Sequence, residues 1–582
     1  MDVSHPDSPN YGKHWTPAHV AATFRPSDDA VAAVRGWLVE SGLAPERVRL
    51  GTGAAWVQAD VSVAQAEALL GTEYFLYQFG DDEDFTHVAC HEKYHLPAGV
   101  APHVELVTPT LHFDVKPKRS APKVEKIERR SGASSNASAK AVGQPGFGTS
   151  FPKTSGVLNT IWSELEDCDE QIVPDCLRAL YTFDYIPIAT DKNSIAIVEY
   201  TPQAYVASDL DLFFSNFSPS QVGERPNLVS IDGGYSQTDY GGFDFNGEAN
   251  LDIQYAMALV GNEQSVTLYQ TGDMVEGASF NNLLDALDAS YCTFEGGDDP
   301  DYDATYPDPY GGGYEGPEDC GTVTPAYIMS TSYGYTEVDL TPAYEQRQCA
   351  EYAKLGLMGM TVLYSSGDYG VAGNYDLCLT PDGYESYDGT IFDPSFPSTC
   401  PYVTAVGATQ VNPGSSVYEP ESACETVIYS GGGFSNVFPM PDYQRAAVEN
   451  YLTAYPPPYP AGTYNTSGSR AYPDLSANGA NYVIAVQGEF YLVYGTSCAS
   501  PVTAAILSAV NDARLAIGKG PIGFINPVIY TPLFMGAFND ITNGSNPGCG
   551  TNGFSAEPGW DPVTGVGTPN FARLLGLWLG LP

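Results

Sequence analysis

The chain has 582 residues, a length that favours at least two domains, and its 43% hydrophobic and 16% charged residues are typical of folded globular proteins. No run of eighteen apolar residues occurs, so the sequence predicts no membrane-spanning helix. The formal net charge of −45 makes nucleic acid and anionic membranes poor partners, and the low sequence pI of about 4.2 points to an acidic working environment.

Residues 1–114 predict a small α+β domain. Residues 28–42 and 61–71 have the periodicity of amphipathic helices, and residues 47–61 that of paired strands. The first residues lack the apolar segment of a signal peptide, so either that signal is missing from this sequence or the protein stays inside the cell. This region holds all eight histidines of the chain: His5, His14, His19, His87, His91, His95, His103 and His112.

Residues 115–153 predict an exposed linker, because they combine nine of the 25 basic residues with many Ser, Gly, Ala and Pro residues. Arg129 and Arg130 form a basic pair that offers a cleavage point, although such pairs in linkers are often only solvated.

From Thr154 onward, short apolar runs alternate with helical segments, which predicts a parallel sheet covered by helices on both faces. In such folds, ligand-binding and catalytic residues lie at the carboxyl ends of the strands. The acidic segment 294–319 predicts a long surface loop. The apolar runs are 194–200, 227–231, 265–269, 326–334, 360–368 and 402–409, and the helical segments include 248–260, 281–291 and 343–359.

The segment GTSCASP, residues 495–501, is typical of a serine nucleophile at the start of a helix. Serine hydrolases usually activate such a hydroxyl with histidine, but no histidine follows His112. If Ser497 is a nucleophile, another group must therefore take its proton.

Glu248 and Asp252 are candidates for that group. They are four residues apart, so on a helix their side chains share one face. In isolation a solvated acidic face is the more common explanation, but the surrounding segment LDIQYAMALV is nearly all apolar. A buried pair would share a proton and titrate as a unit, with Glu248 as the general base and Asp252 orienting it.

Asp368 directly follows an apolar run and precedes Tyr-Gly. Asp beside Gly usually serves a turn or a helix cap. At the carboxyl end of a strand, however, a protonated Asp368 could donate a hydrogen bond to a developing oxyanion.

These motifs, in this order, resemble those of the sedolisins, the serine-carboxyl peptidases. Residues 396–409, 430–439 and 472–479 resemble further signatures of that family, and SHPDSPNYGKHWTP and YHLPAGVAPHVELVTPTLHF resemble its prodomain. The resemblance implies an α/β, subtilisin-like catalytic domain over 154–582 with Ser497, Glu248, Asp252 and Asp368 as catalytic residues. It also implies a small ferredoxin-like α+β prodomain over 1–114, without its usual first strand and helix, and an activation linker over 115–153.

The resemblance further implies one structural calcium ion. Residues 538–544 and 553–571 resemble the calcium loop of the family, and their Gly-rich, Asp-containing composition suits a hard cation. Asp540 and Asp561 would give carboxylates, and Ile541, Glu557 and Gly559 would give main-chain oxygens.

The chain has eleven cysteines, and none of them forms a CxxC pair, which argues against a zinc site. Together with four N-x-S/T sequons, the cysteines favour secretion. Cys498, within an apolar helix, is expected to be a buried free thiol. The expected location is extracellular, with an acidic vacuole or lysosome-like compartment as the alternative. The expected partners are peptide substrates and the chain's own prodomain as inhibitor and chaperone, and a monomer is expected. The sequons lie at Asn136, Asn216, Asn465 and Asn543.

The sequence thus predicts an acid-active peptidase made as a zymogen. Release of tripeptides from free N-termini is the favoured specificity, internal cleavage is the alternative, and residues 326–334 are expected to pair with substrate. A conventional subtilisin is excluded because no histidine lies in residues 154–582, and a non-catalytic binding protein on the same scaffold is the remaining rival.

The placement of the histidines suggests a pH-controlled release of the prodomain. Residues 154–582 contain 10 basic and 52 acidic residues, a net formal charge of −42. Histidines that gain charge below neutral pH would change how tightly residues 1–112 bind the acidic residues 154–582. The histidines to test are His87, His91, His95 and His103. Accidental placement of ordinary surface histidines is an equally good explanation.

Overall fold

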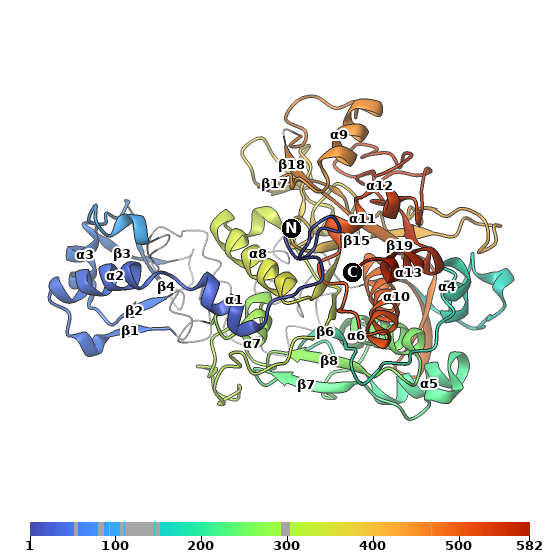
Figure 1. The fold of residues 1–582 in the computed structure, drawn as a ribbon, viewed down its shortest axis with the longest axis horizontal. Coiled ribbons are helices and arrows are strands. Elements are labelled where there is room, and N and C mark those ends of the chain that lie inside the picture. Colours follow the sequence, from blue (N-terminus) through green and yellow to red (C-terminus); the bar gives the residue numbers. More distant parts are fainter. Residues whose placement is uncertain are drawn as a thin grey trace.

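A computed structural model describes residues 1–51, 56–78, 86–91, 93–104, 107, 110, 145, 152–292, 303–466 and 468–582. Most of the expected linker, including Arg129 and Arg130, lies outside these residues. Figure 1 shows a small N-terminal region beside a larger body that contains the central sheet. Within the described ranges, no helix is long and apolar enough to cross a membrane.

The N-terminal region is an α+β unit, as predicted. Ser27 caps α2, and a reciprocal pair of hydrogen bonds between Ser62 and Gln65 opens α3. Strand β1 pairs with β2 and β3 pairs with β4, both antiparallel. The elements are α1 (Pro17–Phe24), α2 (Asp28–Glu40), β1 (Val48–Leu50), β2 (Val57–Ala59), α3 (Val63–Leu70), β3 (Tyr74–Gln78) and β4 (Thr86–Cys90).

The larger body is built on one sheet with the order β16-β15-β11-β9-β6-β8-β7, and β19 also pairs with β15. All of these pairings are parallel except β15 with β16. All six predicted apolar runs form strands of this sheet: β6 (Ile195–Tyr200), β7 (Asn227–Ile231), β8 (Val266–Thr271), β9 (Ile328–Thr331), β11 (Thr361–Ser365) and β15 (Thr404–Gln410). Two further strands, β16 (Ser422–Ala423) and β19 (Leu475–Asn478), pair with β15.

Helices cover both faces of this sheet, and strand β6 shows why. Ile195 and Ile197 belong to the cluster that contains the apolar residues of α6 and α10, whereas Ala196 and Val198 belong to the cluster of α7 and α8. Side chains alternate along a strand, so the two helix pairs lie on opposite faces. The helices are α6 (Phe243–Val260), α7 (Phe280–Leu287), α8 (Pro342–Leu357) and α10 (Thr496–Ala516).

Smaller elements surround this core. The helices are α4 (Pro174–Leu180), α5 (Ala207–Phe217), α9 (Arg445–Ala454), α11 (Asn526–Ile529), α12 (Pro532–Met535) and α13 (Phe571–Gly580). The strands are β5 (Lys153–Val157), β10 (Tyr335–Thr336), β12 (Cys378–Leu379), β13 (Glu385–Ser386), β14 (Ser395–Phe396), β17 (Gly433–Pro439), β18 (Ser469–Tyr472), β20 (Tyr482–Val486), β21 (Glu489–Tyr494), β22 (Phe538–Asn539) and β23 (Thr568–Pro569).

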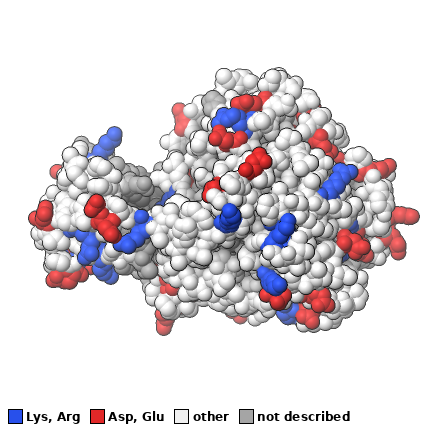
Figure 2. All heavy atoms as spheres, viewed as in Figure 1, with Lys and Arg blue, Asp and Glu red and all other residues white. Residues whose placement is uncertain are grey.

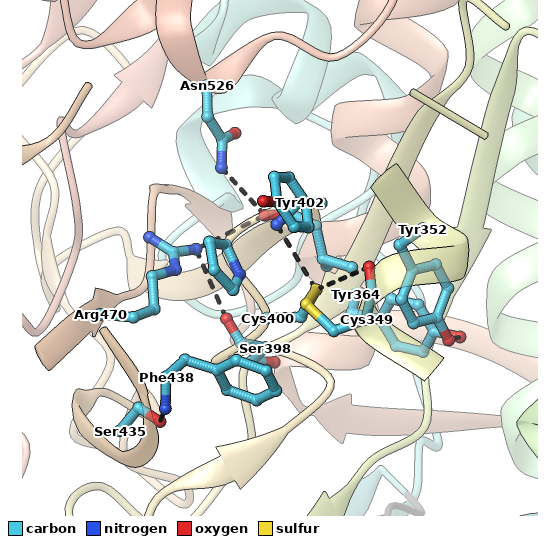
Figure 3. The surroundings of a disulfide bond; sticks show 12 residues. Cys349, Tyr352, Tyr364, Ser398, Cys400, Tyr402, Ser435, Phe438, Arg470 and Asn526 are labelled. Atoms are coloured by element: carbon cyan, nitrogen blue, oxygen red, sulfur yellow. Dashed lines mark hydrogen bonds between the residues drawn. A yellow bond between two sulfur atoms is a disulfide. The ribbon is translucent and has the colours of Figure 1, made fainter. Parts of the chain in front are cut away.

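Four disulfides tie the larger body together: Cys168–Cys176, Cys292–Cys320, Cys349–Cys400 and Cys378–Cys549. Figure 3 shows that Cys349–Cys400 links α8 to the segment before β15, beside the hydrogen-bonded hydroxyls of Tyr352 and Tyr364. Cys498 is a free, buried thiol as predicted, and Cys90 and Cys424 are also free.

The acidic segment 294–319 is only partly the surface loop that was predicted. In its described part, 303–319, Tyr306 is buried: its hydroxyl accepts a hydrogen bond from the Asp273 amide at 3.1 Å and donates to the Gly277 carbonyl. An aromatic ring with a polar tip can fill an interior position when that tip finds partners, which a composition argument does not detect.

Many acidic side chains are buried rather than exposed. Nineteen Asp and Glu side chains of the described residues are buried, against two Arg. On the face in Figure 2, charged groups of both signs are scattered among uncharged residues. The excess of acidic residues is therefore partly an interior property, and burial opposes their ionisation.

The start of the chain docks on the larger body. Tyr11 packs into the same cluster as Trp578, and the Trp15 amide donates to the Leu357 carbonyl at 2.8 Å. His14 lies against the Cα atoms of two glycines: its ring is 2.7 Å from an ideal Cβ on Gly359 and 2.5 Å from one on Gly523. A side chain at either glycine would collide with the imidazole, so these glycines create its socket.

Candidate active site

Ser497 lies in the first turn of α10, against Ser332 just after strand β9. Its hydroxyl donates to the Ser332 carbonyl at 3.4 Å. Pro501, inside the helix, has no N–H to donate to the Ser497 carbonyl, and the Ser332 hydroxyl lies 3.4 Å from that oxygen. The nucleophile candidate is therefore held at the carboxyl edge of the sheet, where the sequence predicted chemistry to collect.

Glu248 and Asp252 project from α6 and are completely buried. Ser332 Oγ donates to Asp252 Oδ2 at 2.6 Å, so Ser332 connects Asp252 to the segment that contacts Ser497. Neither carboxyl oxygen of Glu248 has a hydrogen bond of good geometry, yet the Ser497 hydroxyl is close enough to lower the Glu248 pKa. Such contacts are often poorly aligned without substrate. The solvated acidic face that the sequence left open is thus excluded by burial.

A third buried carboxyl, Glu199 of β6, completes this group and was not predicted. The Tyr333 hydroxyl donates to Glu199 Oε2 at 2.6 Å. Burial first, and then the charge of Asp252, raises the pKa of Glu199. The available sequence signal was a glutamate inside the apolar run SIAIVEY, because an acidic residue rarely occupies a fully buried strand without a function or a partner.

Burial is the main cause that raises the pKa of both Glu248 and Asp252. The negative charges of Asp252 and then Glu199 raise the Glu248 pKa further, and the Ser332 hydrogen bond opposes the rise at Asp252. Carboxyls this close bind and release protons as a unit. In acidic solution, one of these carboxyls can therefore act as a base while a neighbouring carboxyl still holds its proton.

Asp368 lies between the end of β11 and the start of α10. The Thr496 amide and hydroxyl donate to Asp368 Oδ1 at 2.7 and 2.9 Å, so Oδ2 is the oxygen left to carry a proton. An ideal Cβ on Gly495 would lie 3.2 Å from that Oδ2, and the absence of a side chain there keeps Oδ2 accessible. Burial raises the Asp368 pKa, whereas Lys153 and the Thr496 hydrogen bonds lower it.

Asp368 and Ser497 line one pocket, together with Gly334, Ser365, Gly367, Tyr369, Asn374, Ser395 and Thr496. Strand addition along the whole of 326–334 is excluded, because β9 lies inside the sheet with β6 on one edge and β11 on the other. Of the residues that follow β9, Gly334 lines the pocket.

The expected calcium residues lie in two loops that contact each other. The Gly559 amide donates to Asp540 Oδ2 at 2.9 Å, and the Glu557 amide donates to Asp561 Oδ2 at 3.0 Å. Asp561 is buried, and burial raises its pKa to about 8. Ile541 is buried directly after Asp540. Two carboxylates thus lie beside one loop, and carboxylate and main-chain carbonyl oxygens are the ligands that Ca²⁺ prefers.

The structure thus brings together the four predicted catalytic residues and adds Glu199, Ser332 and Tyr333. Such a site can support acyl transfer without imidazole. Ser497 offers the nucleophilic hydroxyl, Glu248 with Asp252 the proton acceptor, and Asp368 a donor to the oxyanion.

Several known proteins are similar to this chain in sequence. Residues 1–113 match the family model "Pro-kumamolisin, activation domain". Aorsin of Aspergillus oryzae is 41% identical over 614 aligned residues that cover 100% of this chain and 90% of that protein. "Tripeptidyl-peptidase SED1" of Arthroderma otae is 41% identical with the same coverage, and "Tripeptidyl-peptidase sed1" of Aspergillus fumigatus is 40% identical and 89% covered.

Among solved structures, Pseudomonas sedolisin, described as a serine-carboxyl proteinase in complex with pseudo-iodotyrostatin, aligns with 22% identity and a TM-score of 0.49. The alignment covers 70% of this chain and 98% of that chain.

Proposed function

Because the chain belongs to the sedolisin family of serine-carboxyl peptidases, we propose that it is an acid-active peptidase made as a zymogen, which releases tripeptides from free N-termini. The observation that carries this proposal is that Ser497 lies against the buried Glu248 carboxyl, with Asp252 one turn away on the same helix, while Ser497 and Asp368 line one pocket.

In the first step Glu248, in its carboxylate form, accepts the Ser497 proton as Oγ attacks the carbonyl carbon of the scissile bond. Asp252, held by Ser332, raises the Glu248 pKa and shares the proton that Glu248 takes up. Glu248 then gives this proton to the leaving amine, and water releases the acyl group from Ser497 by the same steps in reverse.

Asp368 acts on the carbonyl oxygen of the substrate. In its neutral form Oδ2–H donates to the oxyanion, while Oδ1 stays bound to Thr496. Removing one such donor from a serine peptidase costs about 3–4 kcal/mol of barrier. A carboxylic acid can play this part only while it is protonated, which is one reason to expect activity at acidic pH.

The peptidase proposal is tested by pre-steady-state kinetics with an excess of a chromogenic peptide ester at pH 4. A burst of product equal to the enzyme concentration, absent from Ser497→Ala, is expected if Ser497 forms an acyl-enzyme. Stoichiometric binding without any burst would instead support the non-catalytic binding protein.

Tripeptide release is the favoured specificity because relatives with 40–41% identity carry the name tripeptidyl-peptidase. Internal cleavage stays the alternative. Digestion of one peptide in free and N-acetylated form, with products identified by mass, separates them. Tripeptides from the free peptide alone support the exopeptidase, and equal cleavage of both peptides supports the endopeptidase.

One calcium ion is proposed at the loop of residues 557–559. Asp540 and Asp561 would bind it through carboxylates, and Ile541, Glu557 and Gly559 through main-chain oxygens. The ion would neutralise the buried Asp561 carboxylate and join the two loops, a structural role that leaves the chemistry to the pocket. Metal analysis of the dialysed protein tests its presence.

Secretion is proposed because the disulfides require an oxidising compartment, and the prodomain is proposed as the inhibitor of the same chain. A monomer is expected. Size-exclusion chromatography with light scattering, before and after processing, tests both the monomer and the separation of the prodomain.

A further inference from the structure

Lys153 occupies a fixed place beside the pocket. It begins strand β5, which pairs with β21, and its partner in the ladder is Tyr494. Strand β21 leads directly through Gly495 and Thr496 to Ser497. The backbone of Lys153 is therefore tied to the segment that carries the nucleophile.

The side chain of Lys153 turns toward the other side of the pocket. Its Nζ donates to the Asp368 carbonyl at 3.5 Å and lies 3.9 Å from the centre of the Tyr369 ring. A cation over an aromatic face is attracted to it, so the ring supports this position. Burial lowers the Lys153 pKa, but the negative charges of Asp368 and Asp376 raise it, which favours the ammonium form.

We propose that Lys153 is a positioning residue for Asp368: its ammonium, anchored on the Asp368 carbonyl and the Tyr369 ring, fixes the oxyanion-binding aspartate and sets its charge. This inference rests on the proposed role of Asp368 as the donor to the oxyanion.

The physical reason is a competition at one carboxyl group. Burial and the negative charge of Glu248 favour the neutral acid, whereas the Lys153 ammonium and the two Thr496 donors favour the carboxylate. The other titratable groups that face Asp368 are neutral in acidic solution: Tyr369, Cys424 and Cys498. Lys153 thus lowers the pH at which Asp368 ionises and ceases to donate.

The test measures kcat/KM against pH for the processed enzyme. Lys153→Met and Lys153→Gln remove the charge, so Asp368 should stay protonated to higher pH. The alkaline limb, the fall of kcat/KM as pH rises, should therefore move up by about 0.5–1 pH unit. Lys153→Arg keeps a cation and should keep the limb in place. Each variant is first checked for an unchanged melting temperature.

Asp368→Asn supplies the control that separates the two claims. An amide donates at every pH, so this variant should lose the limb due to Asp368, and adding Lys153→Met to it should cause no further shift. If Asp368→Asn removes the limb but both Lys153 variants leave it unmoved, the role of Lys153 is overturned while that of Asp368 stands. If Asp368→Asn leaves the limb unchanged, the proposed role of Asp368 fails.

The mass of the active enzyme provides an independent check. An active form that retains residue 153 supports the inference, and an active form whose chain begins after Lys153 overturns it.

Discussion

At the scale of single residues, burial controls the candidate site. Glu199, Glu248 and Asp252 are completely buried, and burial is the first cause of the raised pKa of each. The same residues on a solvated helix or strand end would be ordinary carboxylates. Their value as acids and bases therefore comes from the surrounding protein rather than from the residue type.

Glu248→Gln should lower kcat/KM by well over tenfold, a rise in barrier of more than about 1.4 kcal/mol, because an amide cannot accept the Ser497 proton. Glu345→Gln is a matched control, since Glu345 is also buried but lies on α8. A Glu248→Gln enzyme with more than about a tenth of the normal kcat/KM would remove Glu248 as the base.

Ser497→Ala should abolish turnover and leave the linker uncut if processing is autocatalytic.

Glu199→Gln should cause a smaller loss and a shift of the acid limb. The negative charge of Glu199 raises the Glu248 pKa, so removing it should let Glu248 ionise, and act as a base, at lower pH. The acid limb of kcat/KM against pH should thus move down, which a purely structural defect would not produce. An unmoved limb would mean that Glu199 supports packing alone.

At the scale of elements, the site is built where α6 and α10 meet the carboxyl ends of the central strands. The apolar faces of both helices pack in one cluster with Ile197 of β6. This packing fixes the approach of Glu248 to Ser497, two residues far apart in the sequence. In the C-terminal loops, contacts between distant segments likewise bring Asp540 and Asp561 to one loop, where each accepts a hydrogen bond from a main-chain amide.

Removal of calcium should lower the melting temperature of the processed protein, because an ion bound only to the folded state stabilises it by mass action. The measurement compares samples with and without chelator at pH 7, and Asp561→Asn should reproduce the loss without chelator. Equal melting temperatures, together with metal analysis that detects no calcium, would withdraw Asp540 and Asp561 as ligands.

At the scale of the whole molecule, two features connect pH to the state of the protein. The interior holds many more acidic than basic side chains, and the start of the chain is docked through a histidine on the larger body. The first feature acts on stability and the second on the attachment of the prodomain.

Folding stability should be greatest in acid. Burial raises the pKa of Glu337 to about 7 and that of Glu345 well above its ordinary value. A carboxyl whose pKa is higher in the folded state binds its proton more tightly there, so the stabilisation is complete below pH 4 to 5 and is lost as pH rises through the folded pKa. In the Ser497→Ala protein, thermal unfolding should give melting temperatures that fall from pH 5 to pH 8.

Glu345→Gln tests the cause of this trend. Both carboxyl oxygens of Glu345 are buried without a hydrogen-bond partner, so a neutral amide replaces the protonated acid without losing such a bond. The variant should match the parent at pH 4 and exceed its melting temperature at pH 8. Identical curves would show that Glu345 does not contribute.

His14 is the best candidate for a proton-controlled attachment of the prodomain, whereas the sequence pointed to His87, His91, His95 and His103. The described rings of His91, His95 and His103 are exposed, but the Nε2 atom of His14 is buried without a partner. Burial, and then Arg514 of α10, lowers the His14 pKa to about 4. Docking is thus favoured above pH 6.5 and weakens as pH falls toward 4.

His14→Gln cannot gain this charge, so its processing midpoint should move to lower pH. His19→Gln, an exposed neighbour stacked on Trp15, should keep the normal midpoint. Densitometry of the processed band after incubation from pH 3 to pH 7 gives both midpoints. If His14→Gln and the parent process alike, the carboxyls of the active site are left as the pH sensor.

The sequence by itself determined the strand–helix alternation, the absence of a histidine after His112 and the candidates Glu248, Asp252 and Asp368, because periodicity and residue type are local properties. Only the tertiary structure decided that Glu199 joins them, that β9 has no free edge, that Lys153 faces Asp368 and that Nε2 of His14 is buried. These facts depend on contacts between residues that are far apart in the sequence. Burial and the charges of such neighbours set the protonation of each group, and no local pattern records them.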